Sequence, residues 1–301
     1  MTRTRILAFS DLAWGTRERG TTVGRKVDGT SFLRRIEETD PAIVVFAGDA
    51  AYDRCSRSGL DETELFLGLL REIAAAGRHS VIVEGNNDDT MGTYGRVRDA
   101  AKASPHIHEI SGEMEIVQGI RFLGVPTGKE KRMAESARGA VDIVVAHAPL
   151  ANRVWLFDLP TACILTGHYG MMAVEIAGKA YLSTDCSPAS YAMIDWEGGW
   201  QRIEFTAGAC RITMRPEEGV VATGCDAAEV RRLTEGAGPL PYRDEVAALR
   251  RAKSEIATLG REKVSRRLLD LGIKKTHIER YLGGRRAPGR RREERLLSSP
   301  P

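Results

Sequence analysis

The stretch HSVIVEGNNDD, residues 79–89, is an apolar run that ends in a glycine and four small polar side chains. Its β-branched residues are typical of a strand. A turn after the strand needs about one small polar residue, so the remaining three call for another explanation. Because amide and carboxylate oxygens are common metal ligands, the stretch indicates a strand whose carboxyl end carries groups suited to metal binding.

Two earlier segments repeat this pattern. TRILAFS (residues 4–10) and AIVVFAG (residues 42–48) are apolar, and each is followed directly by an aspartate. Helical patterns lie between the strands, as SFLRRIEE (residues 31–38) and as DETELFLGLLREIAAAG (residues 61–77), which opens with a capping box. The alternation of strands and helices predicts a layered α/β fold whose first sheet is mainly parallel.

The middle of the chain changes character. Three segments resemble hairpins with glycine-containing turns, over residues 113–125, 172–184 and 190–205. Two further apolar strands, over residues 142–150 and 162–170, each lead to a histidine. These segments predict a second, more antiparallel set of strands over residues 113–206. The simplest assembly is an αββα sandwich, in which two sheets pack together with helices outside, followed by a small C-terminal helical extension.

Charge and composition divide the chain further. Residues 241–301 carry 17 Lys and Arg against 8 Asp and Glu, whereas residues 1–240 carry 27 against 33. We expect a main domain over residues 1–206, a β extension and linker over 207–240, a basic helical segment over 241–283 and a disordered basic tail over 284–301. The basic region suits nucleic acid or an acidic partner. A solvated helical surface with a loose tail explains the same charges.

Composition also disfavours several classes of protein. The chain has no run of about 18 apolar residues, which is the length that a membrane span needs, so we expect no membrane partner. Its start turns polar too early for a secretory signal. The five cysteines contain no CxxC pair, which predicts reduced thiols in a cytoplasmic protein rather than a disulfide framework or a zinc ribbon. Nothing in the composition indicates an oligomeric state.

Five strand ends carry side chains able to bind a metal, namely Asp11, Asp49, Asn86, His147 and His168. In an α/β sheet, ligands gather at the carboxyl ends of the strands. Nitrogen and oxygen donors of this kind suit Zn, Mn or Fe better than Ca. Each residue alone has a simpler interpretation, because the aspartates also suit helix caps and the histidines also suit core or turn positions. The succession of five such strand ends favours a metal site.

The order and spacing of these residues resemble the calcineurin-like metallophosphoesterases over roughly residues 4–206. The family pattern D-x-H, G-D, G-N-H-D/E, a lone His and G-H-x-H appears here as DLA at 11–13, GD at 48–49, GNND at 85–88, AHAPL at 146–150 and GHYG at 167–170. The resemblance implies an αββα sandwich with a divalent metal centre. Carried over residue by residue, it implies one complete metal position formed by Asp49, Asn86, His147 and His168.

The chain departs from the family pattern at the other metal position and at the acid. The resemblance implies that Asp11 and Asp49 remain from that position, while Ala13 and Gly170 replace its two histidines. Asn87 occupies the catalytic position of a family histidine that contacts phosphate and donates a proton, and an amide cannot act as that acid. The resemblance therefore predicts a centre that has lost one metal position and holds one tightly bound divalent ion, Mn, Zn or Fe.

Other residues near this centre have candidate supporting roles. We expect Asp88 to brace the loop by accepting hydrogen bonds from backbone N–H groups. Arg17 could bind a substrate phosphate, or it could be a solvated loop charge. Trp14 and Tyr169 could wall the pocket or stack on an aromatic substrate, and core packing is the alternative for both.

The C-terminal helices allow two interpretations. Short helices over residues 262–271 and 277–282 are separated by a turn that contains Gly272, and Thr276 is expected to cap the second helix. This spacing is loosely that of a helix-turn-helix, with nucleic acid as the candidate partner. A packing element for the sandwich or a dimer contact would give the same pattern.

Taken together, the sequence predicts a metal-dependent phosphoesterase that hydrolyses a phosphodiester or phosphomonoester with metal-activated water. The missing general acid is typically worth about 10²–10⁴-fold in rate, so substrates with good leaving groups should be favoured. The alternative is a catalytically inactive protein of the same fold that binds a nucleotide, a nucleic acid or a protein partner. The departures at Ala13, Asn87 and Gly170 keep this alternative open.

Overall fold

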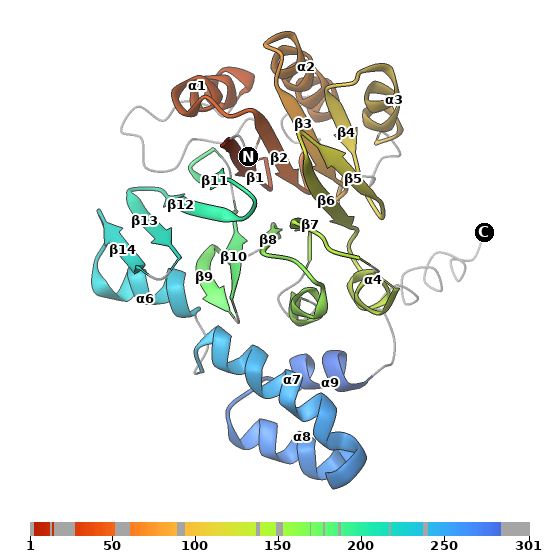
Figure 1. Ribbon diagram of the computed structural model, residues 1–301, viewed down its shortest axis with the longest axis vertical. Coiled ribbons are helices and arrows are strands. Elements are labelled where there is room, and N and C mark those ends of the chain that lie inside the picture. Colours follow the sequence, from red (N-terminus) through yellow and green to blue (C-terminus); the bar gives the residue numbers. More distant parts are fainter. Residues whose placement is uncertain are drawn as a thin grey trace, which may run out of the picture.

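The computed structural model describes residues 3–12, 14, 28–51, 61–88, 94–136, 139–148, 153–168, 170–176, 178–185, 188–216, 218–236 and 240–283. Within them the chain forms two β-sheets packed face to face, with helices on both outer sides (Figure 1). The αββα sandwich and the C-terminal helical extension predicted from the sequence are confirmed.

The first sheet joins strands that come early in the chain with strands that come late. Its order is β14-β13-β12-β11-β1-β2-β3-β4. The strands are β1 (Thr4–Phe9), β2 (Ile43–Ala47), β3 (His79–Val83), β4 (Ile107–Glu109), β11 (Ser190–Trp196), β12 (Trp200–Ala207), β13 (Cys210–Arg215) and β14 (Gly219–Thr223). β1 to β4 are parallel, and the four late strands form an antiparallel meander that begins beside β1.

The second sheet has the order β5-β6-β7-β8-β10-β9. Its strands are β5 (Met114–Val117), β6 (Ile120–Val125), β7 (Ile143–Ala146), β8 (Cys163–Thr166), β9 (Met172–Ile176) and β10 (Lys179–Ser183). The expected grouping of all strands over residues 113–206 in a more antiparallel set is wrong in two respects. β11 and β12 belong to the first sheet, and within the second sheet β6, β7, β8 and β10 are paired parallel. The first sheet, expected to be mainly parallel, is parallel only over β1 to β4. β11 pairs antiparallel with β1, and a hairpin pattern in the sequence does not show which sheet it joins.

Helices cover the outer faces of both sheets, except α6, whose buried Leu233 belongs to the layer between the sheets. They are α1 (Gly29–Thr39), α2 (Glu62–Ala75), α3 (Gly95–Ala103), α4 (Glu130–Ser136), the short 3-10 helix η2 (Val154–Asp158), α6 (Ala227–Glu235), α7 (Tyr242–Leu259), α8 (Arg261–Asp270) and α9 (Lys275–Gly283). One half of the capping box predicted for α2 is present, since the Asp61 carboxylate accepts a hydrogen bond from Glu64 N at 2.8 Å, whereas the Glu64 carboxylate pairs with Arg71 at 2.9 Å. α1 to α3 lie on one side of the molecule and α7 to α9 on the other (Figure 1).

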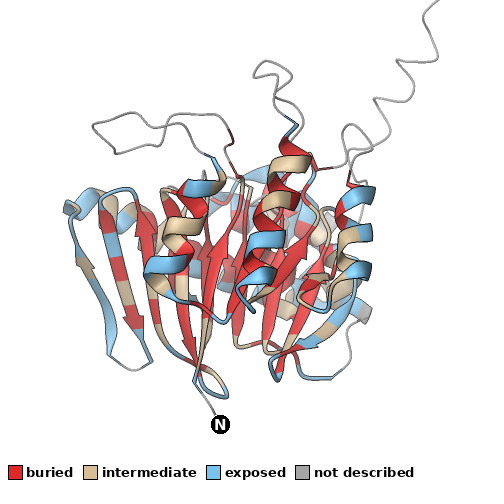
Figure 2. Cartoon of the chain, turned by 90° about the horizontal axis from the view of Figure 1, so that it is seen from above, coloured by how far each residue is buried: buried red, intermediate tan, exposed pale blue. Residues whose placement is uncertain are grey.

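Side-chain alternation along the strands builds three apolar layers. In β2, Val45 faces the layer between the sheets, whereas Val44 and Phe46 face α1 and α2. In β7, Val145 faces the central layer and Val144 faces the second outer layer. Both faces of these strands are therefore buried (Figure 2), which explains their unbroken apolar runs.

The C-terminal helices share the second outer layer with the sandwich. Tyr242, Leu249, Leu268 and Tyr281 are buried in one cluster with side chains of β6 to β10 and η2. The division of the chain at residues 206, 240 and 283 remains a prediction, and the tail over residues 284–301 lies outside the described residues.

Thr276 does not cap α9. The helix begins at Lys275, and the backbone N–H groups of His277 and Ile278 both donate to the carbonyl of Lys274. Thr276 therefore lies in the first turn. The sequence signal placed the start of the helix two residues late, at residue 277 instead of Lys275, which is an ordinary error for helix ends.

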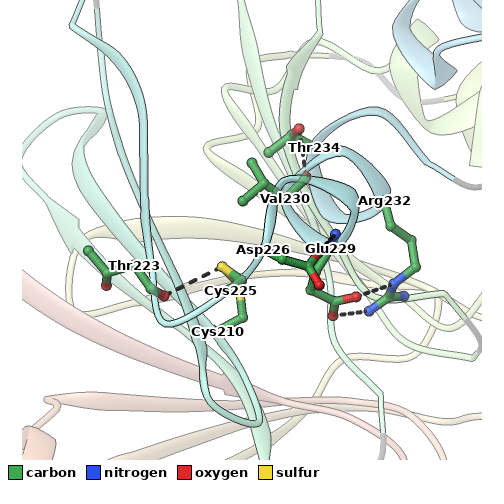
Figure 3. Close-up of a disulfide and its surroundings, with 8 residues drawn as sticks. All are labelled: Cys210, Thr223, Cys225, Asp226, Glu229, Val230, Arg232 and Thr234. Carbon is green, nitrogen blue, oxygen red and sulfur yellow. Dashed lines mark hydrogen bonds and ion pairs between the residues drawn. A yellow bond between two sulfur atoms is a disulfide. The ribbon is translucent and has the colours of Figure 1, made fainter.

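The expectation of reduced thiols is wrong for one pair of cysteines. Cys210 and Cys225 form a disulfide with a Cα–Cα distance of 4.8 Å, which links the β13–β14 hairpin to the start of α6 (Figure 3). The hairpin register pairs Arg211 with Thr223 and so brings the two cysteines together, whereas their 15-residue separation in sequence gives no sign of it. Cys163 is a buried free thiol.

In the described part of the chain, none of the helices has the combined length and apolar character that crossing a membrane requires.

The shared outer layer leads to a stability prediction. Leu249 in α7 is fully buried, and Leu249→Ala should lower the free energy of unfolding by about 2–5 kcal/mol because it leaves a cavity under the helix. Leu259→Ala in the same helix is the matched control, since Leu259 is 38% exposed and its truncation should change stability by about 0.5 kcal/mol or less. Urea unfolding monitored by circular dichroism measures both. Equal, small effects would mean that α7 does not share the sandwich core.

Candidate metal centre

The candidate site lies where strands of the two sheets end side by side. β1 to β3 run parallel in the first sheet, and β7 and β8 run parallel in the second. His147 directly follows β7, and its Nδ1 atom lies 2.8 Å from the carbonyl oxygen of Ala47 at the end of β2. This contact joins the carboxyl ends of the two sheets, so the polar side chains that follow the strands face one another.

Three of the five candidate ligands come together there. One ligand atom each from Asp49, His147 and His168 lies within 4.8 Å of the other two. Asp49 and His147 are buried, and His168 is half-buried. The three side chains follow β2, β7 and β8, so neither sheet alone could form the cluster.

Hydrogen bonding orients the ring of His147 at the centre of this cluster. With Nδ1–H donating to the Ala47 carbonyl, the neutral ring carries a lone pair on Nε2. Nε2 lies 3.3 Å from Asp49 Oδ2 and 3.2 Å from His168 Nδ1. A carboxylate oxygen and a bare ring nitrogen are both acceptors, so a proton or a cation must lie between them at this distance.

The donor set fits a divalent cation. Ligands at about 2.0–2.2 Å from a tetrahedral metal ion lie about 3.3–3.6 Å from one another, close to the separations that surround His147 Nε2. A metal-bound histidine commonly donates its other ring N–H to a backbone carbonyl, which fixes its tautomer. His147 has this arrangement without any rearrangement of its ring.

The backbone at the site is held in an unfavourable conformation. Asp11, Asp49 and His168 have φ values of 50°, 52° and 78°. Residues other than glycine rarely adopt positive φ, and the conformation costs about 1–3 kcal/mol per residue where the surrounding structure enforces it. Concentration of this strain at three candidate ligands is typical of a functional site.

The loop after β3 holds the Asp49 carboxylate from the opposite side. Asn87 donates its backbone N–H to Asp49 Oδ1 at 3.0 Å and its side-chain Nδ2–H to Oδ2 at 2.6 Å. Asn87 therefore positions Asp49 instead of pointing an acid at a substrate. Asn86 is exposed, and no hydrogen bond joins it to the other described candidate ligands.

Asp88 braces the same loop, as expected from the sequence. Its fully buried carboxylate accepts hydrogen bonds from the backbone N–H groups of Asp49, Gly85 and Ala51 at 2.9, 2.7 and 2.8 Å. Burial raises the pKa of Asp88 to about 7. The three bonds tie the turn after β3 to the turn after β2.

Asp11 lies beside the cluster. Its Oδ2 accepts the backbone N–H of His168 at 2.9 Å, which connects the turns after β1 and β8. It is not a member of the group whose ligand atoms lie within 4.8 Å of one another. Burial raises the pKa of Asp11 to about 6, which the nearby His147 opposes.

The pKa values of the cluster divide it into one charged pair and one neutral ring. Burial and the neighbouring His147 lower the pKa of His168 to about 4, so this ring is neutral at pH 7. Burial favours the neutral form of Asp49, but hydrogen bonds from His147 and Asn87 outweigh it and lower the pKa of Asp49. Burial likewise opposes protonation of His147, but Asp49 outweighs it and raises the pKa of His147. Asp49 and His147 therefore each favour the charged form of the other.

Glycines allow the elements of the site to approach one another. A Cβ atom at Gly85 would lie 2.1 Å from Asp49 Oδ1, and one at Gly167 would lie 2.4 Å from the Ala47 carbonyl oxygen. Both are far below any normal contact. The glycines of the GN and GH motifs are thus required by close packing around the candidate ligands.

The remaining candidate residues are distributed differently. Trp14 is 2% exposed, packs against Phe32 and donates its ring N–H to the Ala50 carbonyl at 2.8 Å, which is a core position. Arg17 and Tyr169, like Ala13, lie outside the described residues. Gly170 is described, with φ at 90°.

A buried arginine that the sequence analysis missed connects the two histidine turns. Arg153 is fully buried, and its guanidinium donates to the carbonyls of Ala148 and Gly167 at 2.7 and 2.6 Å. It also donates to the hydroxyls of Tyr181 and Ser183 at 2.8 and 3.0 Å. Ala148 follows His147 and Gly167 precedes His168, so Arg153 is a positioning residue for both rings. The only signal in the sequence is a lone arginine in an apolar stretch, which is too weak to single it out.

Arg153→Met tests this positioning role. The substitution leaves two buried carbonyls without their donor, at about 1–3 kcal/mol each, and should weaken Mn²⁺ binding by the folded protein about 10–100-fold, as loss of other supporting contacts to ligands does. Isothermal titration with Mn²⁺ below the unfolding temperature measures the affinity. Arg153→Lys should give a smaller loss of affinity, because one ammonium group can replace only some of the hydrogen bonds that the guanidinium donates.

The exposed Arg211 provides the matched control, since Arg211→Met removes an arginine far along the chain from the two histidine turns and should leave Mn²⁺ affinity unchanged. Unaltered Mn²⁺ affinity in folded Arg153→Met would show that Arg153 contributes only to stability.

Comparison with known proteins places this site in a family. The family model described as calcineurin-like phosphoesterase matches residues 4–174, which is more than half of the chain. No protein with a curated description matches.

Solved structures resemble the chain only distantly. TT1561 of Thermus thermophilus is 13% identical with a TM-score of 0.46, and the match covers 64% of this chain and 95% of that one. Yfce, a phosphoesterase from E. coli, is 12% identical with a TM-score of 0.38, and the match covers 74% and 100%. An archaeal phosphodiesterase is 11% identical with a TM-score of 0.37, and the match covers 70% and 99%. The family model, and not these distant structural similarities, is the evidence for the assignment. The chain belongs to the calcineurin-like phosphoesterase family.

Proposed function

We propose that the chain hydrolyses phosphate esters at the centre formed by Asp49, His147 and His168, and that this centre holds one divalent cation. Family membership supports phosphoester hydrolysis. The observation that carries the proposal is the approach of an Asp49 oxygen and a His168 nitrogen to within 3.3 Å of the Nε2 atom of His147. The cation would polarise a phosphoryl oxygen and lower the pKa of a water molecule.

The protein groups around this centre have separate tasks in the proposal. Asn87 fixes the plane of the Asp49 carboxylate through two hydrogen bonds. The Ala47 carbonyl holds His147 in the tautomer that exposes Nε2. The low pKa of His168 keeps its ring neutral and able to act as a ligand at pH 7. Nitrogen and oxygen donors together favour Mn, Zn or Fe as the ion.

Asp11 and Asn86 complete the proposed set of ligands in different ways. Asp11 is half-buried, and its carboxylate accepts a hydrogen bond from the backbone N–H of His168, a member of the cluster. Asn86 is exposed and directly precedes Asn87 in the loop after β3. Substituting Asp11 and Asn86 one at a time shows whether each residue binds the metal or only supports the ligands.

Leaving-group chemistry limits the proposed substrate. In this proposal Asn87 occupies the position of the acid in the family pattern, and its side-chain amide already donates a hydrogen bond to Asp49. A leaving group that departs as a stable anion needs no such proton. We therefore propose that aryl esters or phosphoanhydrides react faster than simple alkyl esters, whether the substrate is a phosphodiester or a phosphomonoester.

Metal binding and hydrolysis should fail together when a cluster residue is removed. His168→Ala should lower the Mn²⁺ content of the protein and reduce kcat/KM for bis-p-nitrophenyl phosphate by about 10²-fold or more, since loss of supporting contacts alone costs about 10–100-fold. Elemental analysis after Mn²⁺ loading and a spectrophotometric assay measure the two effects. If Asn86→Ala has the same effect, Asn86 is a ligand as well.

His106→Ala is the control for this experiment, because it removes a half-buried imidazole that lies outside the cluster. A wild-type protein that takes up no Mn²⁺, Zn²⁺ or Fe²⁺ and hydrolyses no phosphate ester would overturn the proposal. It would favour the alternative of an inactive member of the family that binds a nucleotide, nucleic acid or protein partner.

The role of Asn87 predicts how the substrate range can be changed. Asn87→His introduces a titratable ring at the acid position and should raise the rate on a methyl phosphodiester relative to the p-nitrophenyl ester, within the factor of about 10²–10⁴ that a general acid supplies. Asn87→Gln is the matched control, since it keeps an amide at the same position and introduces no titratable ring. Equal wild-type rates on the alkyl and p-nitrophenyl esters would contradict the leaving-group argument.

A further inference from the structure

We propose that α8, the turn that follows it and α9 form a helix-turn-helix that binds double-stranded DNA. The inference concerns a surface on the side of the molecule opposite α1 to α3 (Figure 1) and stands whether or not the chain hydrolyses phosphate esters. It rests on the geometry of the turn, the division of α9 into a buried and an exposed face, and the charge of that exposed face.

The connection between the two helices is short and well defined. α8 ends at Asp270 and α9 begins at Lys275. Gly272, with φ at 81°, follows the last turn of α8, and the N–H of Ile273 returns to the carbonyl of Leu268 at 3.1 Å. A glycine-containing turn of three to four residues between two helices is the connection that the DNA-binding motif uses.

The inner faces of the two helices are fixed to the rest of the protein. Val264, Leu268, Ile273, Ile278 and Tyr281 are each at most 3% exposed and belong to the outer apolar layer of the second sheet. The opposite side of each helix is exposed. The motif is therefore held rigidly, which a helix that enters a groove requires.

Polar contacts set the rotation of α9 about its own axis. His277 Nδ1 lies 2.5 Å from Glu245 Oε1 in α7. The ring of Tyr281 lies 4.5 Å from that of Trp155 in η2, and its hydroxyl donates to Asp158 at 3.3 Å. α9 is thus anchored on two elements along a single face.

The opposite face of α9 is exposed and carries groups that suit DNA. Its exposed residues are Lys275, Thr276, Glu279 and Arg280, and Lys274 is exposed directly before the helix begins. The spacing of the four helical residues places them on one side of a helix of 3.6 residues per turn. Lysine, arginine and threonine bind phosphates, and arginine also reads guanine in the major groove. The Lys275–Glu279 ion pair is 75% and 62% exposed, so it restrains Lys275 little.

Charge identifies the class of partner. Residues 261–283 carry seven Lys and Arg against three Asp and Glu, within a chain whose net charge is only +3. Together with the helix-turn-helix geometry, this excess favours a duplex whose major groove accommodates an α-helix. An acidic protein or an anionic membrane would use the charge but would not need the exposed face of α9 in this orientation.

Fluorescence anisotropy with a labelled 30-base-pair duplex tests the proposal on the full chain. In low salt, the double variant Lys275→Gln/Arg280→Gln should raise the Kd at least tenfold. The plot of log K against log salt should lose about 0.9 in slope for each phosphate contact removed. Circular dichroism should show unchanged folding, because both positions are exposed.

Arg291→Gln/Arg292→Gln is the matched control, since it removes the same charge from the arginine-rich segment after α9. It should raise the Kd less than threefold. Absence of salt-dependent duplex binding by the wild-type protein, or equal losses in both double variants, would overturn the assignment. Duplex binding unaffected by the α9 variant, or binding only to anionic vesicles, would overturn it as well.

Discussion

The hydrogen bond between His147 and the Ala47 carbonyl is the contact on which the candidate site depends. Each sheet supplies only part of the cluster, since Asp49 follows β2 of the first sheet and His147 follows β7 of the second. The two layers must approach closely at this end for the ring nitrogen to reach the carbonyl at 2.8 Å. Gly48 and Gly167 permit that approach, because a Cβ atom at either position would collide with the ring or Cβ of His147. The packing of the sandwich and the geometry of the site are therefore one constraint.

The residues with positive φ at the site are held in place by hydrogen bonds that their backbone N–H groups donate to other residues. The N–H of Asp49 donates to Asp88, that of His168 donates to Asp11, and that of Asp11 donates to the Gly48 carbonyl. Each bond fixes a residue whose φ is positive. Buried carboxylates hydrogen-bonded to backbone N–H groups offset the cost of strain, so two of the aspartates in this region contribute scaffolding. Asp11 has this task in the folded chain in addition to any role as a ligand.

Much of the architecture follows from local patterns in the sequence, whereas the contacts between distant segments do not. The apolar runs before Asp11, Asp49 and His147 predicted strands correctly, because burial on both faces leaves an unbroken apolar pattern. The transfer of β11 to the first sheet and the Cys210–Cys225 disulfide depend on pairing partners that no local pattern reveals. α3 and α6 were missed because each has one fully buried side chain, too few to produce a helical period.

The site itself shows the same division. The order of polar strand ends predicted that Asp49, His147 and His168 would meet, because parallel strands place their carboxyl ends at one edge. The sequence could not show that Arg153 would join both histidine turns, since a buried arginine has no periodic signature. It also did not show which asparagine after Gly85 would face Asp49, because neighbouring side chains in a turn point in directions that only the backbone decides. Four small polar residues in a row thus specify a turn, and packing decides which of them contacts the site.

The backbone also supports the proposed single-cation centre. Asn87 occupies one acceptor position on each oxygen of Asp49, so half of the roughly four acceptor positions of this carboxylate are already used. The remaining position on Oδ2 faces His147. Gly170 has φ at 90°, a conformation that side-chain-bearing residues rarely adopt, so a histidine there would require the turn to change. A second ion held by a histidine at position 170 would need a different turn after β8. The backbone at Gly170 is therefore consistent with the single cation of the proposal.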